Sequence, residues 1–385
     1  MTLHFSREEY DHRRDRLIGT MEESGLDAML LFSQESMYWL TGFDSFGFCF
    51  FQCLIVRANG DMSLLTRMPD LRQAKHTSTI EDIHVWMDWG DVGPVGQLRD
   101  LMDSLDMLGE NIGVEYDTAG LTAFYGRQLD DRLKSFGNLT DASKIIPNLR
   151  AKKSYAEIEF IREAAVMADD ALEAGLAVIK PGANDADVLT AMQGSVFAAG
   201  GGYPGNGFIV GSGKDALLCR TKSGRRILEE QDQITLEFAG ASKNYHSALM
   251  RTVVLGEPTE RHLELFDAAK TAMTACEEVM TPEHTFGDVF EAHASVLDER
   301  GLHPHRLNAC GYSLGARFAP SWMDTPMFYR QNMEQIVPNM SLFLHIIIMD
   351  SETETAMTLG RTYLTTSEAP EPLSRLPIEL ISING

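Results

Sequence analysis

The segment at residues 236–252, LEFAGASKNYHSALMRT, concentrates side chains that can carry proton chemistry. It holds a carboxylate at Glu237, an imidazole at His246 and a guanidinium at Arg251, while Ala248 stands where a second acid would be sought. A carboxylate can activate water or attack a substrate directly, and an imidazole can exchange a proton near neutral pH. The segment is therefore a candidate active site, and the first question is whether that site holds a metal.

The alternation of side chains around Glu237 predicts a β-strand. In the sequence TLEFA this carboxylate points away from its apolar neighbours, and residues 240–244 form a turn that lets a second strand return alongside. A buried carboxylate without a partner is unfavourable. We therefore expect Arg220, His246 or Arg251 beside Glu237, in either a structural ion pair or an active site.

The first part of the chain alternates helical and strand patterns, which is typical of an α/β domain. A cap at Ser6 predicts a helix that runs to about Gly25. Further strands are predicted at 27–33, 48–56, 62–66 and 111–115, and further helices at 94–107 and 121–135. We therefore predict an α/β amino-terminal domain over residues 1–148.

The second part of the chain begins with a capping box, SYAE, at Ser154. Apolar residues at helical spacing follow it, and further helices are predicted at 185–198, 259–280 and 286–300. Strand patterns dominate the remaining sequence. Helices in pairs around a mostly antiparallel sheet predict an α+β domain over residues 149–385.

The glycine-rich sequence GGGYPGNG at residues 200–207 is a candidate binding loop. It lacks the G-K-[ST] ending of a phosphate loop and does not run from a strand into a helix. We predict instead a turn that lines a pocket, with Tyr203 as a substrate contact.

The composition excludes several classes of partner. The formal net charge of −23 over 385 residues would repel nucleic acid and an anionic membrane surface. No apolar run approaches the length of a membrane span, and the apolar fraction of 44% supports a sizeable core. Five cysteines without a CxxC pair, and no signal sequence, predict a cytoplasmic protein with reduced thiols.

Five segments carry a resemblance to a known family: FIVGSGKDA (208–216), ITLEFAGASKNYHSALMRTVVLGEP (234–258), ACGYSLGARFAPSW (309–322), VPNMSLFLHIIIMD (337–350) and AMTLGRTYLTT (356–366). On these the chain resembles the M24 "pita-bread" family of methionine aminopeptidase, prolidase, creatinase and ectoine hydrolase. The two-domain layout is similar to the prolidase and creatinase branch. The resemblance implies a creatinase/prolidase-like amino-terminal domain and a pita-bread catalytic domain.

Metal-dependent members of that family bind two divalent cations through Asp, Asp, His, Glu and Glu. The matching positions here are Glu237, Ala248, Tyr312, His345 and Gly360. Two divalent cations require hard oxygen ligands and charge neutralisation, and only Glu237 among these residues is a carboxylate. The resemblance therefore implies that no dinuclear metal site and no other cofactor are present. A single zinc ion on Glu237, His246 and His345 is the remaining metal alternative.

The resemblance also points to relatives that work without metal. Creatinase and ectoine hydrolase cleave C–N bonds and lack the ligand set, and the ectoine hydrolase pattern is the closer of the two. The shared features are a Glu at position 237, the pair Tyr245-His246, the sequence from Gly311 to Trp322, and the loop that ends at Pro204. The departure lies on the last strand, where Thr358, Gly360 and Arg361 replace acidic residues, which implies a substrate other than ectoine.

The resemblance and the residue types together assign roles. Glu237 is the expected base or nucleophile, and His345 or His246 the expected proton donor to the leaving nitrogen. Arg220 is expected either to bind a substrate carboxylate or to pair with Glu237, and Tyr312 to donate a hydrogen bond to developing negative charge. The predicted activity is metal-independent hydrolysis of an amide or amidine C–N bond in a small zwitterionic metabolite that carries a carboxylate.

In the creatinase-like branch, the amino-terminal domain of one subunit helps to close the pocket of its partner. The aromatic loop at residues 42–48 matches that region. We therefore expect a homodimer in which Asp44 and Phe46 contact the partner's substrate, against the simpler alternative of ordinary hairpin packing.

Three other functions compete with this hypothesis. An Xaa-Pro metallopeptidase would hold two metals per chain. A lyase that acts on a related small zwitterion would use the same residues and differ only in its products. A ligand-binding protein on an inactive peptidase fold would bind a small metabolite without consuming it.

Overall fold

The computed structural model describes residues 2–88, 92–221 and 226–384 of the chain. The chain divides into two compact units, Met1–Arg150 and Ala151–Gly385, and this division lies two residues beyond the boundary expected from the sequence. No helix in the described part of the chain is both long and apolar enough to span a membrane.

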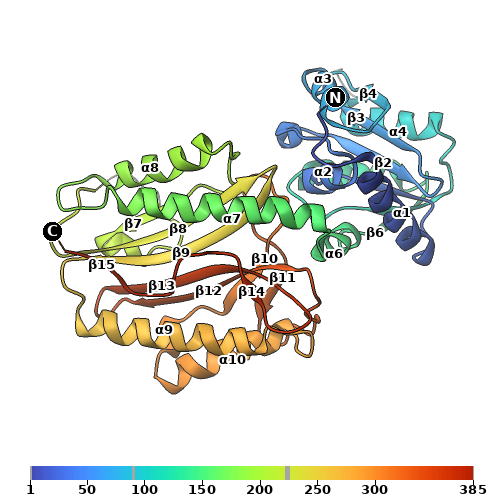
Figure 1. Cartoon of the computed structure of the whole chain (residues 1–385). Helices are drawn as coiled ribbons and strands as arrows, with labels where there is room; N and C mark the ends of the chain where they lie inside the picture. The colour runs from blue at the N-terminus through green and yellow to red at the C-terminus, as the bar shows by residue number, and fades with distance from the viewer. Residues whose placement is uncertain (1, 89–91, 222–225, 385) are drawn as a thin grey trace. The chain divides into compact units, whose positions relative to one another are not determined.

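The first unit is a mixed sheet with the strand order β4-β3-β2-β1-β5-β6 (Figure 1). Its strands are β1 (Ala28–Leu31), β2 (Cys53–Arg57), β3 (Met62–Thr66), β4 (Asp82–Val85), β5 (Asn111–Val114) and β6 (Asn138–Asp141). Its helices are α1 (Arg7–Glu23), α2 (Gln34–Thr41), α3 (Met68–Thr77), α4 (Gly93–Ser104), α5 (Ala123–Leu133) and α6 (Ile145–Ala151). Strand β1 pairs in parallel with β5 and antiparallel with β2, so the predicted α/β class is confirmed.

One predicted strand of this unit is shorter than expected. The apolar run 48–56 begins as a 3-10 turn at Gly47–Cys49, and β2 starts only at Cys53. The turn forms because the Ser45 hydroxyl accepts the Gly47 N–H at 2.9 Å and itself donates to the Asp70 carboxylate at 2.7 Å. These local hydrogen bonds give the backbone an alternative to the sheet.

The second unit is a largely antiparallel sheet with the strand order β11-β10-β12-β13-β9-β8-β7, to which β14 adds on β13 and β15 on β9. Its strands are β7 (Ile209–Ser212), β8 (Asp232–Ser242), β9 (Tyr245–Leu255), β10 (Ala309–Ser313), β11 (Asp324–Tyr329), β12 (Ser341–Asp350), β13 (Thr355–Leu364), β14 (Glu371–Pro372) and β15 (Ile381–Ile383). Its helices are α7 (Tyr155–Leu176), α8 (Asp185–Ala198), α9 (Glu260–Val279) and α10 (Phe286–Glu299). Figure 1 shows α7 lying along β8 and β9, and α9 along β12 and β13.

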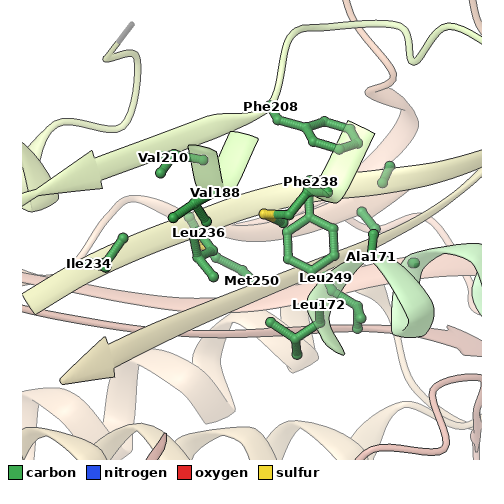
Figure 2. Close-up of a cluster of buried hydrophobic side chains, with 14 of the residues drawn as sticks. Ala171, Leu172, Val188, Phe208, Val210, Ile234, Leu236, Phe238, Leu249 and Met250 are labelled. Atoms are coloured by element: carbon green, nitrogen blue, oxygen red, sulfur yellow. The ribbon is translucent and has the colours of Figure 1, made fainter. Parts of the chain in front are cut away.

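Helix α7 begins where the sequence predicts. Ser154 and Glu157 form the expected capping box, and Glu157 also accepts a hydrogen bond of 2.8 Å from the Tyr245 hydroxyl at the start of β9. Further along the helix, Ala171 and Leu172 join the apolar cluster that strands β8 and β9 line with residues such as Phe238 (Figure 2). Capping and apolar burial therefore fix the strand pair that carries the candidate active site.

The β8–β9 hairpin is tighter than the turn predicted at 240–244. Strand β8 continues through Ser242, and only Lys243 and Asn244 form the turn, with φ values of 47° and 65°. Two successive residues of positive φ match the twist of a two-residue hairpin. Gly240 is a strand residue, and a Cβ there would approach the Ala164 carbonyl oxygen of α7 to 2.0 Å, so the glycine permits close helix packing rather than a turn.

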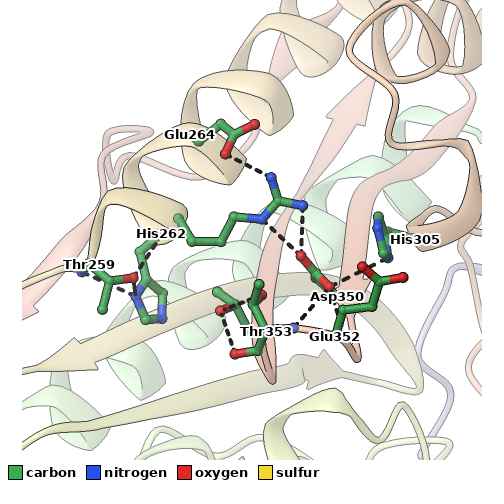
Figure 3. A network of polar contacts seen from close by, with 9 residues as sticks. Thr259, His262, Glu264, His305, Asp350, Glu352 and Thr353 are labelled. Carbon is green, nitrogen blue, oxygen red and sulfur yellow. Dashed lines mark hydrogen bonds and ion pairs between the residues drawn. The ribbon is translucent and has the colours of Figure 1, made fainter.

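A network of polar contacts connects the carboxy-terminal end of β12 with the first turn of α9 (Figure 3). Arg261 donates from Nε to Asp350 at 2.9 Å and pairs with it through Nη2 at 2.7 Å, and His305 lies 3.8 Å from the same carboxylate. Asp350 ends the strand that carries His345. This network therefore anchors the strand, and His305 takes part in it rather than in the candidate site.

Candidate active site

The strand register gathers the predicted site residues on one face of the second sheet. Glu237 of β8 pairs with Met250 of β9, Met250 with Gly360 of β13, and Gly360 with His345 of β12. Residues paired across antiparallel strands point to the same face. Tyr312 of β10 pairs with Phe343, two residues before His345, and so belongs to that face as well.

A cavity of about 340 Å³ opens on this face. Four of the predicted residues line it, namely Arg220, Glu237, Tyr312 and His345. The remaining lining residues are Asn206, Cys219, Leu307, Asn308, Ala309, Met323, Met327 and Ile347. The cavity thus sets polar and titratable groups against an apolar wall, as small-molecule sites do.

Glu237 is the titratable centre of the cavity. The residue is only 8% exposed, and burial raises the pKa of its carboxyl to about 7, although the Arg220 charge and a hydrogen bond from Tyr312 both favour the ionised form. Desolvation disfavours a charged carboxylate and so makes it a stronger base. A carboxyl with this pKa can take up a proton and return it at neutral pH.

A chain of hydrogen bonds orients the Glu237 carboxylate. The indole Nε1–H of Trp322 donates to the Tyr312 hydroxyl oxygen at 2.9 Å. Tyr312 therefore keeps its own proton for Glu237, and burial raises the pKa of this phenol, which holds it neutral. Trp322 is fully buried, and its backbone N–H donates to the Asn206 side chain at 3.1 Å. In the sequence Trp322 is recognisable only as the end of a family motif. Its hydrogen bond to Tyr312 could not be predicted, because the sequence does not show which hydroxyl an indole contacts.

His345 lies in the cavity wall but does not match the expected protonated acid. Burial, together with the Arg220 charge, lowers the pKa of its imidazole to about 4, so the ring is neutral at neutral pH. Its Nδ1 atom is buried and finds no hydrogen-bond partner in the part of the chain that the structure describes. A neutral ring can orient a substrate through a hydrogen bond, whereas it cannot supply the proton of an imidazolium.

Arg220 is the cation of the cavity. It forms no ion pair with any carboxylate in the described part of the chain, and its charge acts on Glu237 and Tyr312 from a distance. The side chain is exposed. Of the two roles expected for Arg220, the contact with a substrate carboxylate therefore fits the structure, and a close pair with Glu237 does not.

His246 does not reach the cavity. It is fully buried, its Nε2 accepts the Gly205 N–H at 2.9 Å, and its Nδ1 lies 3.3 Å from the Gly315 carbonyl oxygen. With both ring nitrogens bonded to backbone groups, His246 joins the glycine-rich loop to the chain after β10. Gly205 packs closely against Trp322: a Cβ at this position would lie only 2.6 Å from the Trp322 backbone nitrogen, so no larger residue fits without a shift. His246 is thus a positioning residue, and its expected role as proton donor does not fit this geometry.

The other predicted substrate contacts, Tyr203, Asp44 and Phe46, are not among the described residues that line the cavity. Tyr203 is 85% exposed and packs edge-to-face on Phe197, so the glycine-rich loop contributes Asn206 to the cavity instead. Asp44 and Phe46 belong to the first unit. The Phe46 side chain is 84% exposed, and Asp44 is held through its backbone by Thr77 and Gln73.

The donor set does not fit a pair of divalent cations. Ala248 offers no ligand atom, and at Gly360 a Cβ would meet Met250 and the Phe343 ring at 2.7 Å, so apolar groups fill the space of a fifth ligand. Within the described ranges, no group of three or more His, Cys, Asp or Glu side chains is placed to hold a metal ion. Because His246 is committed to backbone groups, the mononuclear zinc alternative on Glu237, His246 and His345 also loses a ligand.

Comparison with known proteins agrees with this architecture. Residues 159–367 match metallopeptidase family M24, and residues 13–152 match the creatinase/prolidase N-terminal domain. The ectoine hydrolase of Halomonas elongata is 26% identical over 355 residues, which cover 88% of each chain.

Solved structures share the fold over nearly the whole chain. The Xaa-Pro dipeptidase from Bacillus anthracis superimposes with a TM-score of 0.84 at 20% identity, covering 97% of this chain and 100% of that one. The prolidase from Thermococcus sibiricus superimposes with a TM-score of 0.87 at 18% identity, covering 97% and 99%. The two-domain creatinase/prolidase fold expected from the sequence is confirmed, and the chain belongs to metallopeptidase family M24, a family of hydrolases.

Proposed function

We propose that this M24 protein is a metal-independent hydrolase that cleaves an amide or amidine C–N bond in a small zwitterionic metabolite bearing a carboxylate. The observation that carries the proposal is Glu237, a buried carboxyl with a pKa of about 7 in a cavity that also holds the Arg220 guanidinium, which pairs with no described carboxylate. The relationship to an ectoine hydrolase supports C–N hydrolysis of a small metabolite.

The residues present can perform the reaction in two proton transfers. Arg220 binds the substrate carboxylate in bidentate fashion and places the scissile C–N bond beside Glu237. Ionised Glu237 takes a proton from water, and the resulting hydroxide adds to the carbonyl or amidine carbon. The protonated Glu237 then gives that proton to the leaving nitrogen as the C–N bond breaks, so the carboxyl ends the cycle as it began. One residue thereby serves as base and acid, and no imidazolium is required.

The remaining polar groups have supporting roles in this scheme. The Tyr312 hydroxyl, fixed by Trp322, keeps Glu237 aimed at the attacking water. Neutral His345 orients the substrate by a hydrogen bond. The last strand departs from the ectoine hydrolase pattern at three positions. One of them, Arg361, pairs with Leu344 and not with His345, so it lies on the face of the sheet opposite the cavity. Thr358 and Gly360 share the face of the cavity, and we assign the change of substrate to them.

The test begins with a screen for small nitrogenous carboxylates that raise the melting temperature. A ligand that is consumed identifies the substrate, and product analysis separates a hydrolase, which adds water, from a lyase. Glu237→Gln should then lower kcat by at least a hundredfold, the usual size of a lost general base, and the surface variant Glu159→Gln should keep it. Full turnover by Glu237→Gln would refute the mechanism, and a ligand that is bound but never consumed would indicate a binding protein.

The homodimer is part of the same proposal. The support for a dimer is that two aromatic side chains of the first unit are exposed: Phe46 of the aromatic loop is 84% exposed, and Phe50, just after this loop, is 51% exposed. Sedimentation at several concentrations tests it, with Phe46→Ala expected to weaken association and to raise KM. A monomer at micromolar concentration that retains full activity would contradict it.

A further inference from the structure

A second cavity lies on the opposite face of the second sheet. It encloses about 260 Å³ between α7, β9 and the carboxy-terminal segment 376–382. Its walls are mostly apolar, contributed by Leu172, Leu176, Leu376, Pro377, Leu380 and Ile381. The one basic residue among its lining residues is Arg251. Because Arg251 pairs with Leu236, one residue before Glu237, this cavity is separated from the active site by the thickness of the sheet.

The Arg251 guanidinium is buried and has no counterion among the residues that the structure describes. The residue is 1% exposed, and its Nη1 donates to the carbonyl oxygens of Met250 at 2.8 Å and Gly360 at 2.7 Å. Among the described residues, its Nη2 has no hydrogen-bond partner, and no carboxylate forms an ion pair with it. Burying an unpaired charge is costly, so such a group favours a bound anion.

A second guanidinium near Arg251 makes a bound anion more favourable still. Arg361 lies on the same face, two residues from Leu359, the partner of Arg251 on β13. Its buried Nε also lacks a hydrogen-bond partner within the described ranges. Burial and the Arg361 charge together lower the pKa of Arg251 to about 10. The Asp169 carboxylate of α7 acts on Arg251 through its charge, but it is engaged by the Ser374 hydroxyl and the Arg375 backbone.

We propose that this cavity binds a small monocarboxylate with a short alkyl group, its carboxylate on Arg251 and its alkyl group against the leucine walls. A single guanidinium matches a single negative charge, whereas a second charge would find no further cation among the described lining residues and would be repelled by Glu173 and Glu379. The volume corresponds to roughly eight non-hydrogen atoms at about 30 Å³ each. Hexanoate is the probe that fits this size. The bond from Arg251 to the Gly360 carbonyl joins the site to the strand residue paired with His345.

The experiment is calorimetric titration of the full-length protein with hexanoate. It is done in an Arg220→Gln background, so that the carboxylate site proposed in the active-site cavity cannot contribute. We expect one saturable site per chain, with affinity that rises from acetate to hexanoate. At ten times Kd, the ratio of folded to unfolded protein should rise about elevenfold.

Two variants and two controls decide the outcome. Arg251→Gln removes the charge, and Leu176→Trp fills the cavity while leaving the guanidinium in place; each should weaken binding at least tenfold. Arg162→Gln changes the net charge equally at an arginine of α7 that is paired with Glu371, and should bind as before. Hexanamide, which is neutral, should bind at least tenfold more weakly than hexanoate. Equal binding of hexanamide, unchanged binding by Leu176→Trp, or no saturable binding at millimolar hexanoate would each overturn the proposal.

Discussion

The pKa of Glu237 predicts that the residue proposed for catalysis destabilises the folded protein above neutral pH. Its pKa is about 7 in the folded state against 4.5 for the free side chain. Between these values the folded state holds a proton that the unfolded state has released, so the free energy of unfolding falls as the pH rises through this window. A difference of about 2.5 in pKa at about 1.4 kcal/mol each corresponds to about 3 kcal/mol.

Glu237→Gln removes this titration and nearly preserves the side-chain volume. The free energy of unfolding of the variant minus that of the wild type should therefore increase by about 3 kcal/mol between pH 4.5 and pH 8. His345, whose lowered pKa gives stability that is lost only as the pH falls below 6.5, titrates in both proteins and cancels in the difference.

The assay is urea unfolding followed by far-ultraviolet circular dichroism and tryptophan fluorescence at several pH values. Glu159→Gln, at an exposed carboxylate of α7, is the matched control for the loss of one carboxylate and is measured in parallel. A Glu237→Gln difference that stays flat within about 0.5 kcal/mol would show that Glu237 does not titrate near 7, and the reasoning from burial would be refuted.

Three further predictions test the roles of individual residues. Arg220→Gln should raise KM at least tenfold and change kcat by less than about threefold in steady-state kinetics, because the guanidinium binds the carboxylate and not the reacting carbon. Trp322→Phe should lower kcat about fivefold, the value of one hydrogen bond of about 1 kcal/mol, since Tyr312 loses the donor that fixes its proton. His246→Ala should lower the free energy of unfolding by about 2 to 4 kcal/mol in urea, because it leaves Gly205 without an acceptor and opens a buried space.

The elements that position the site could be read from the sequence because local rules decide them. The capping box at Ser154 begins a helix at Tyr155, and the period-two pattern around Glu237 identifies both the strand and the face of the sheet. The family resemblance, which matches both residues to ligand positions, is what linked Glu237 with His345 in the sequence, and the strand register places both in one cavity.

What the sequence could not provide is the protonation state and the partner of each polar group. The sequence does not distinguish the roles of His246 and His345. In the structure, His246 is held between the backbone groups of Gly205 and Gly315, whereas His345 is neutral in the cavity wall. These differences depend on burial and on contacts between residues distant in the chain. The partner of Tyr312, the indole of Trp322, is fixed by the fold of the intervening chain for the same reason.

The central claim is that Glu237 performs the chemistry without a metal. The direct test is turnover by protein dialysed against a strong chelator, measured together with elemental analysis of the same sample. We expect well below one divalent metal ion per chain and unchanged kcat on the identified substrate. Two tightly held metal ions per chain, or activity that is lost on chelation and restored by manganese, cobalt or zinc, would contradict it.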